Sequence, residues 1–289
     1  MNPPACGPLC HATLIVDAAA PLVSAYAALG LAVLTVQRIS AAQAQAWGQP
    51  ALQNRRCTEL GTGSPAQTLL RLIEVPGTPP RPTRFSHGWL ALEILVRDVD
   101  ALAQRLPAAH FNVVGEPADL ALSPHIRAMQ VVGPAGEMLY LTQVKAPVPP
   151  FVLPLSADLP ATQSVGALFI AVMSTPSREH TLQAVAALAP LSTLRFETKV
   201  TVLNRALGRP IDSLWPLATA QFAGASLFEI DEVLDDRVGP AAPPGGLPGG
   251  LAWVTLLAPD ARRDSVLFEV SPGAWLELKN RSSRARFSA

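Results

Sequence analysis

Cysteine, charge and long apolar runs are all scarce in this 289-residue chain. The three cysteines, Cys6, Cys10 and Cys57, are too few for a disulfide framework in a chain of this length. Cys6, Cys10 and the adjacent His11 have no second Cys/His pair that would complete a tetrahedral zinc site. We therefore expect free thiols in a reducing cytoplasm.

The low charge and the short apolar runs exclude two further classes of protein. Lysine plus arginine and aspartate plus glutamate number 22 each, so the chain has no basic excess for binding nucleic acid. No apolar run approaches the roughly 20 residues that cross a bilayer. The first residues, MNPPACGPLC, have neither the basic segment nor the apolar core of a signal peptide. We predict a cytoplasmic protein with no nucleic-acid and no membrane partner.

Motifs of several common enzymes are also missing. The sequence has no GxGxxG, no P-loop and no GxSxG, so it does not support nucleotide cofactors or a serine hydrolase. What it has is 49% hydrophobic residues, enough for two packed cores at this length. Proline density marks a boundary at residues 146–150. We predict a first domain at 1–145, a proline-rich linker at 146–163 and a second domain at 164–289.

The N-terminal half contains two similar units of a strand, a helix and further strands. In the first unit a strand at 11–16 precedes Asp17, a predicted helix cap, and a helical stripe that Gly30 ends, followed by strands at 31–36 and 68–75. The second unit has a strand at 89–96, Asp98 as helix cap, and strands at 111–114, 128–132 and 138–144. This recurrence is an internal repeat.

The C-terminal half repeats the pattern twice more. The third copy is predicted to contain a strand at 167–173, a helix at 179–188 and strands at 193–202, 219–221 and 226–233. The fourth copy has strands at 251–257, 265–270 and 275–279. Its connection at 258–264 is too short for a crossover helix, so this copy is predicted to lack its helix. Residues 239–250, rich in proline and glycine, are predicted to form a loop.

The openings and endings of these units carry a family resemblance. HATLIVD (11–17) and WLALEILV (89–96) are similar to the openings of glyoxalase-type modules, and VVGPAGEMLYL (131–141) and SPGAWLEL (271–278) are similar to their endings. The chain therefore resembles the vicinal oxygen chelate superfamily from about His11 to Lys279. The resemblance implies an α+β fold of tandem domains, in which paired βαβββ modules form curved mixed sheets around a cavity.

The resemblance also implies metal-ligand positions on the first and last strand of each module. Strand alternation directs His11, Thr13 and Ile15 into the cavity, and His11 takes the first ligand position. The next three positions hold Arg71, Ala91 and Tyr140. Arginine stays protonated and presents only donors, so it is no ligand. A divalent metal is therefore not supported by a full ligand set, and the cofactor stays unknown. The remaining metal candidates are His11, Glu229 and Glu277, the two carboxylates being able to hold Mg²⁺ or Mn²⁺ with waters.

Without a metal, the same positions form a polar set with catalytic potential. We assign catalytic roles to His11, Arg71, Glu93 and Tyr140. Arg71 suits an anionic oxygen, His11 and Glu93 could exchange protons, and Tyr140 could bind an oxyanion. Thr13, His87 and Trp47 are assigned to substrate binding. The structural alternative is that Arg71 and Glu93 pair with each other.

Two functions stay open at this point. One is a glyoxalase- or dioxygenase-like enzyme, of the lyase, isomerase or dioxygenase type, that binds and transforms a small oxygen-rich or anionic molecule. The other is a non-enzymatic protein that binds a drug or another aromatic compound. In both cases the partner is a small-molecule ligand, and a second chain forming a homodimer could complete the cavity. Fold alone does not choose between them.

Overall fold

The computed structural model describes residues 6–62, 67–108, 110–243, 246–259 and 265–280. The first module contains β1 (Leu9–Val16), α1 (Ala20–Ala28), β2 (Ala32–Arg38), α2 (Ala41–Ala46), the short 3-10 helix η1 (Pro50–Leu52), β3 (Arg56–Thr62) and β4 (Gln67–Glu74). After η2 (Thr83–Phe85), the second module contains β5 (Gly88–Val96), α3 (Val99–Arg105), β6 (Asn112–Leu120), β7 (Ser123–Val132) and β8 (Met138–Val144).

The second half follows the same plan. After η3 (Ser156–Asp158), the third module contains β9 (Val165–Thr175), α4 (Arg178–Ala186), β10 (Ser192–Lys199), α5 (Thr201–Ala206), β11 (Leu214–Phe222) and β12 (Ser226–Glu232). The fourth contains β13 (Gly250–Ala258), β14 (Ser265–Ser271) and β15 (Ala274–Asn280). Most of the predicted helix-free connection, residues 260–264, lies outside the described residues.

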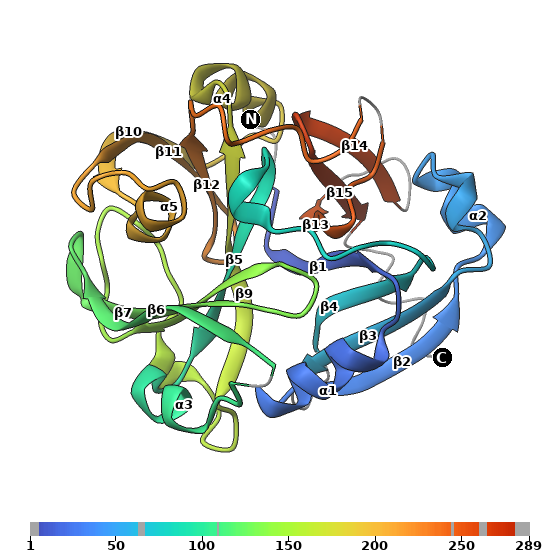
Figure 1. The fold of residues 1–289 in the computed structure, drawn as a ribbon, viewed down its shortest axis with the longest axis horizontal. Coiled ribbons are helices and arrows are strands. Elements are labelled where there is room, and N and C mark those ends of the chain that lie inside the picture. The colour runs from blue at the N-terminus through green and yellow to red at the C-terminus, as the bar shows by residue number, and fades with distance from the viewer. Residues whose placement is uncertain (1–5, 63–66, 109, 244–245, 260–264, 281–289) are drawn as a thin grey trace.

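These strands form two curved mixed sheets that stand side by side (Figure 1). The seven-stranded sheet has the order β14-β15-β13-β1-β4-β3-β2, and the eight-stranded sheet has the order β10-β11-β12-β9-β5-β8-β7-β6. The α+β fold of paired modules is therefore confirmed. The first module shares a sheet with the fourth, and the second with the third. Each sheet therefore takes strands from both halves of the chain. The predicted division into two domains on either side of residues 146–163 stays a prediction.

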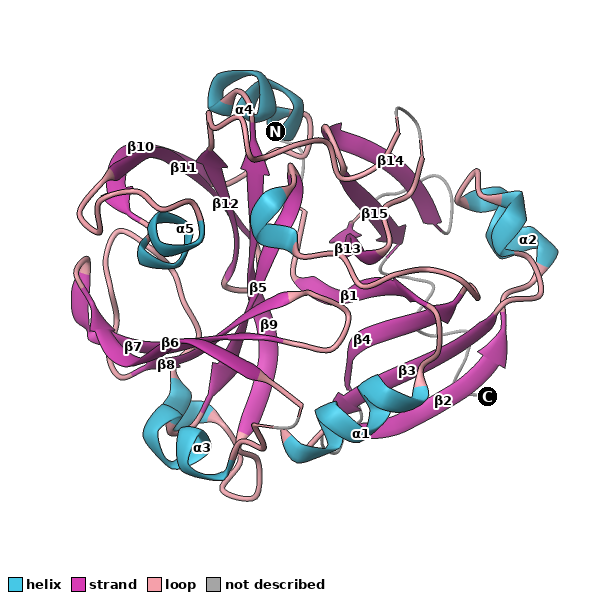
Figure 2. Ribbon diagram, in the orientation of Figure 1, coloured by secondary structure: helices cyan, strands magenta, loops and turns pink. Residues whose placement is uncertain are grey.

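Strand alternation divides the side chains between a shared core and two concave faces. The core lies between the sheets and under α1, α3 and α4; it contains Ala12, Leu14 and Val16 of β1 with Leu92 and Ile94 of β5. The opposite faces carry separate apolar clusters, to which α2 contributes on the seven-stranded sheet and α5 on the eight-stranded sheet. Figure 2 shows α2 at the right edge of the molecule and α5 in its left half, between β10 and β7. The predicted inward direction of His11, Thr13 and Ile15 follows from this alternation.

Local sequence signals were correct in some places and wrong in others. Asp98 caps α3 as predicted, accepting from the Ala101 amide at 3.0 Å, and Gly30 ends α1 with a φ of 90°. Asp17 does not cap α1: the cap is Ala19, whose amide donates to Glu74, while Asp17 accepts from the amide of Gly77. An acceptor on the neighbouring strand end has replaced the local cap.

Two further predictions about elements need correction. The strand expected at 193–202 ends at Lys199, and α5 follows it, because Val202 and Leu203 are buried in the concave face of the eight-stranded sheet. Strand β3 was missed: its sequence, RCTELGT, mixes polar and small residues. It is nevertheless held between β2 and β4 by ladder hydrogen bonds on both sides.

Candidate functional site

The two concave faces can be compared position by position through the strand registers. On the seven-stranded sheet, His11 pairs with Thr255, and Thr255 pairs with Glu277; Arg71 lies beside Thr13 on β4. On the eight-stranded sheet the same relations join Ala91, Val172 and Glu229, and place Tyr140 beside Glu93 on β8. Thus Glu229 corresponds to Glu277, and Tyr140 corresponds to Arg71.

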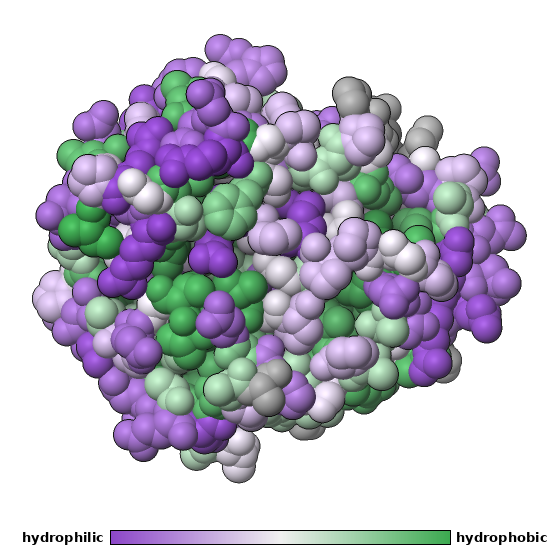
Figure 3. Space-filling model, in the orientation of Figure 1, coloured by the Kyte–Doolittle hydropathy of each residue, from purple (hydrophilic) through white to green (hydrophobic). Residues whose placement is uncertain are grey.

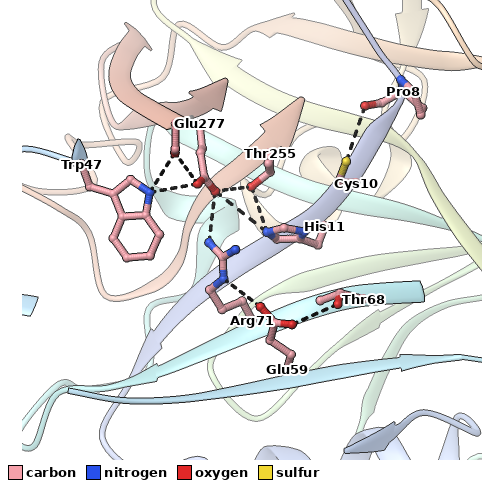
Figure 4. A network of polar contacts seen from close by, with 10 residues as sticks. Pro8, Cys10, His11, Trp47, Glu59, Thr68, Arg71, Thr255 and Glu277 are labelled. Carbon is pink, nitrogen blue, oxygen red and sulfur yellow. Dashed lines mark hydrogen bonds and ion pairs between the residues drawn. The ribbon is translucent and has the colours of Figure 1, made fainter. Parts of the chain in front are cut away.

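A buried polar network fills the seven-stranded face (Figure 4). We call it the Arg71 network; its members are His11, Trp47, Glu59, Arg71, Thr255, Ser265 and Glu277. The Arg71 guanidinium donates to Glu277 at 3.0 Å, lies 3.6 Å from Glu59, and sits 5.2 Å from the centroid of the Trp47 ring. Burial alone would lower the pKa of Arg71, but the charge of Glu277 outweighs it and the pKa is raised.

Glu277 is the centre of this network. Its oxygens accept from Trp47 Nε1 at 2.9 Å, from Ser265 at 2.6 Å and from Thr255 at 2.7 Å, in addition to Arg71. Burial favours the neutral acid, yet the positive charges of Arg71 and His11 outweigh burial and hold the pKa of Glu277 well below its usual range. Both oxygens are thus already committed to donors of the chain.

His11 joins the network through Thr255. Its Nε2 lies 3.1 Å from the Thr255 hydroxyl and 3.9 Å from Glu277. Because the single hydroxyl proton of Thr255 is donated to Glu277, the contact with His11 requires that Nε2 carries a proton and donates. His11 is 4% exposed, and a protonated Nε2 offers no lone pair to a metal, so His11 is a wall of this face.

The residues at the expected metal positions do not fit a metal. On the seven-stranded face the Arg71 guanidinium occupies the space next to the one carboxylate, whose oxygens are saturated. On the eight-stranded face the equivalent positions are Ala91, Tyr140, Val172 and Glu229, with a single carboxylate among them. No group of three or more His, Cys, Asp or Glu side chains in the described part of the chain is arranged to hold a metal ion. Glu229 and Glu277 lie on different sheets, so they form no joint site.

The eight-stranded face holds an open cavity of about 540 Å³, whereas the cavity of about 620 Å³ on the seven-stranded side lies beside Ile15 and Leu52 and includes no member of the Arg71 network. Glu93 on β5, Tyr140 on β8 and Glu229 on β12 line it together with residues of β6, β10 and α5. A smaller space of about 60 Å³ adjoins it and shares Glu93 and Glu229. The walls of the smaller space are mainly apolar: Leu120, Leu122, Phe151, Leu153, Phe169, Phe196 and Leu227. The larger cavity combines apolar side chains such as Phe196 and Leu217 with charged ones at its rim, among them Asp119, Lys199 and Arg205. Figure 3 shows hydrophobic side chains gathered on this part of the surface, between α5 and α3.

Three carboxyl groups lie on the sheet side of this cavity, and we call Glu93, Glu229 and Asp231 the carboxyl cluster. Glu93 accepts from the Thr142 hydroxyl at 3.2 Å. Burial first, and then the charge of Glu229, raise the pKa of Glu93 to about 8, although the Thr142 bond opposes this. Burial raises the pKa of Glu229 to about 7, against the effect of its hydrogen bond with Asp231. Burial and the charge of Glu229 raise the pKa of Asp231 well above its ordinary value.

The four predicted catalytic residues divide between the two faces. His11 and Arg71 lie together in the Arg71 network, whereas Glu93 and Tyr140 lie together in the cavity of the eight-stranded sheet. The alternative pairing of Arg71 with Glu93 is wrong, because Arg71 pairs with Glu277 and Glu59. Their catalytic roles stay predictions.

The predicted substrate-binding residues all lie away from this cavity. Thr13 is fully buried and Trp47 donates to Glu277, both on the seven-stranded face. His87 lies before β5, with Nδ1 3.3 Å from the Ser174 hydroxyl. Sequence reasoning missed Asp231, Thr142 and Thr219, which line or flank the cavity. The available signal was the spacing of Glu229 and Asp231, two acids on the same face of an apolar strand.

Comparison with known proteins finds solved structures with a similar fold. No family model and no curated protein matches the chain. Glyoxalase I from Zea mays is a similar solved structure, with a TM-score of 0.59 and 14% identity over 96% of this chain and 94% of that chain. A putative dioxygenase from Bacillus subtilis subsp. subtilis str. 168 aligns with a TM-score of 0.62 and 10% identity over 96% and 86%. The chain therefore has the vicinal oxygen chelate fold, and the resemblance noted in the sequence is confirmed at the level of fold.

The structure also bears on the expectations about membrane spans and cysteines. None of the described helices has the length and apolar character needed to cross a bilayer. Cys57 is a buried free thiol, and the Cys10 thiol contacts the carbonyl of Pro8 at 3.9 Å. Location in the cytoplasm and a homodimer stay predictions.

Proposed function

We propose that this chain binds a small organic molecule in the cavity of the eight-stranded sheet and exchanges a proton with it through Glu93 and Glu229. The observation that carries the proposal is the placement of two carboxyl groups, with pKa values raised to about 8 and about 7, where a cavity of about 540 Å³ meets a smaller space with mainly apolar walls. Apolar pockets with a few converging polar groups of shifted pKa are typical of binding and catalytic sites.

The raised pKa values favour proton transfer over a purely passive cavity. A general acid or base works best when its pKa lies near the working pH. Glu93 and Glu229 meet this condition without a metal, and Tyr140 supplies a hydroxyl beside them. The chemistry that suits such a pair is isomerisation or elimination of the lyase or isomerase type. Dioxygenase chemistry has no support from the side chains of either face.

Sequestration without conversion is the second candidate, and the apolar lining supports it. Phe196, which lines both spaces, offers a flat apolar surface to an aromatic compound, and Phe151 and Phe169 line the smaller space beside it. The two candidates share the cavity and differ in whether a product forms. Chromatographic analysis of a bound compound after long incubation separates them.

A fragment screen tests the shared claim. A panel of small aromatic and alicyclic compounds, including neutral, cationic and anionic members, is screened by thermal shift against wild type, Glu93→Gln and Phe196→Ala. We expect several hits whose affinity falls in both variants. Glu197→Gln is the matched control, since Glu197 is exposed on β10 and points away from Phe196. A screen without hits, or hits indifferent to both cavity variants, would contradict the proposal.

A further inference from the structure

We propose that the ligand of the eight-stranded cavity is an organic cation: an amine, amidine or guanidine carried on an apolar body. This inference rests on the proposed function and adds the chemical class of the ligand. It comes from a difference between the two concave faces, which the strand registers make comparable residue by residue.

The seven-stranded face supplies its own cation. There the carboxylate of Glu277 is neutralised by the guanidinium of Arg71 at 3.0 Å, with His11 at 3.9 Å. Arg71 comes from β4, and the equivalent position on β8 of the eight-stranded face is Tyr140, a neutral side chain. The carboxylate at the equivalent of Glu277 is Glu229. The seven-stranded face thus contains the ion pair of Glu277 with Arg71. The eight-stranded face has the equivalent acid, Glu229, but no cation at the position of Tyr140.

Among the described residues of the eight-stranded face, more than one carboxyl group lacks a positively charged partner. Glu93, Glu229 and Asp231 gather there, and within the described ranges no lysine, arginine or histidine forms an ion pair with any of them. Neither carboxyl oxygen of the fully buried Asp231 has a donor from the described chain beyond a proton shared with its neighbour Glu229. Buried acids without donors are costly, and a bound cation removes that cost.

Charged groups at the rim of the cavity do not fill this need. Lys199 of β10 pairs with Asp212, and Arg205 of α5 donates to the carbonyl of Val114. Asp119 of β6 pairs with Lys145 and Arg127, and Glu116 adds a further acid. The rim is therefore mixed in charge, whereas the sheet side is acidic.

The shape of the space favours an organic cation over a metal ion. The carboxyl cluster is not arranged to ligate a metal within the described residues. The walls in front of it are apolar and aromatic, among them Phe169, Phe196 and Leu227. A ligand that suits both features has an apolar body against these walls and an ammonium-like group against Glu93 and Glu229. Aromatic side chains also attract cations through their faces.

Three probes with one apolar body test the ligand class: benzylammonium, benzyl alcohol and benzoate, measured by isothermal titration. We expect benzylammonium to bind at least about tenfold more tightly than benzyl alcohol, because hydrogen bonds to charged groups are the stronger ones. Benzoate should bind most weakly. Glu229→Gln should weaken benzylammonium by about tenfold and leave benzyl alcohol nearly unchanged. Glu197→Gln should change neither.

The internal comparison suggests a second, independent variant. Tyr140→Arg places on β8 the cation that β4 carries as Arg71, so the chain should neutralise Glu229 itself and lose benzylammonium binding. Circular dichroism checks that Tyr140→Arg is folded. If Tyr140→Arg does not fold, Glu229→Gln alone tests the role of the Glu229 carboxyl group. Affinity for benzylammonium should also rise from about pH 6 to about pH 8, as the carboxyl groups with raised pKa lose their protons.

The failures of the two proposals can be told apart. If benzyl alcohol or benzoate binds as tightly as benzylammonium, and Glu93→Gln weakens it, the cavity is a binding site and the cationic class is wrong. If benzylammonium binds equally to wild type, Glu229→Gln and Tyr140→Arg, the placement of the cation is wrong. If benzylammonium does not bind, the inference is overturned, and the fragment screen decides separately on the cavity.

Discussion

Replacement of Arg71 by methionine removes the cation from a buried network and leaves its carboxylate behind. In the variant Glu277 keeps the hydrogen bonds from Trp47, Thr255 and Ser265 but has no guanidinium at 3.0 Å. Breaking a buried pair by removing one partner costs about 3–5 kcal/mol. For a chain of this size we expect a fall in melting temperature of roughly 6–20 °C, at about 2–4 °C per kcal/mol. Urea unfolding at neutral pH measures the free energy directly.

A double-mutant cycle then separates pairing from packing. Because replacing a whole buried ion pair by apolar side chains is often nearly neutral, Arg71→Met/Glu277→Met should be less destabilised than the sum of the single variants by about 2 kcal/mol or more. Arg127→Met is the matched control: it breaks a surface pair with Asp100 at 2.8 Å and should leave the free energy of unfolding nearly unchanged. A loss below about 1 kcal/mol for Arg71→Met, or additive single variants, would refute a stabilising network.

The further predictions concern pH, the network wall and a helix cap. The pKa of Glu93 is raised to about 8 in the folded state from 4.5, so between these pH values the folded state binds more protons than the unfolded state, and wild-type stability should fall as pH rises from about 5 to about 8. Glu93→Gln should flatten this pH dependence, which urea unfolding at about pH 5 and about pH 8 measures. A variant with the same pH dependence as wild type would contradict the prediction. The folded pKa of Glu277 is lowered, so its stabilisation is present above 4.5 and lost below, and the deficit of Arg71→Met should shrink in acid; a constant deficit would contradict this. Trp47→Phe removes the donor at 2.9 Å from Glu277 and should cost about 1–3 kcal/mol, with benzylammonium binding unchanged as the control. Asp98→Ala should cost about 1 kcal/mol through the lost cap of α3, whereas Asp17→Ala should leave helix content in circular dichroism unchanged.

The repeat of strand, helix and strands could be predicted from the sequence because its signals lie within short stretches of each module. The short apolar runs of β1 and β5, the Asp98 cap and the left-handed Gly30 are signals within a few residues. Alternation also gave the correct directions of His11 and Glu93. Elements held mainly by neighbours were harder: β3 has little strand character of its own and depends on β2 and β4.

The grouping of the site residues could not be predicted from local pattern. It depends on which modules share a sheet, and the two junctions, β1 with β13 and β5 with β9, join residues far apart in the chain. The observed pairing places Arg71 beside Glu277, 206 residues away. The same long-range pairing brings Glu229 to Glu93 and creates the carboxyl cluster. Sequence periodicity carries no information on this choice.

The central claim is that Glu93 and Glu229 form a proton-exchanging pair that a ligand engages. Carboxyl carbon NMR of the protein labelled at glutamate, with Glu93→Gln and Glu229→Gln used for assignment, measures their titration with and without saturating benzylammonium. We predict midpoints near the raised pKa values of about 8 and about 7 in the free protein, and a fall of both when the cation binds. Titration of both groups near the ordinary value of 4.5, unchanged by the cation, would contradict the account.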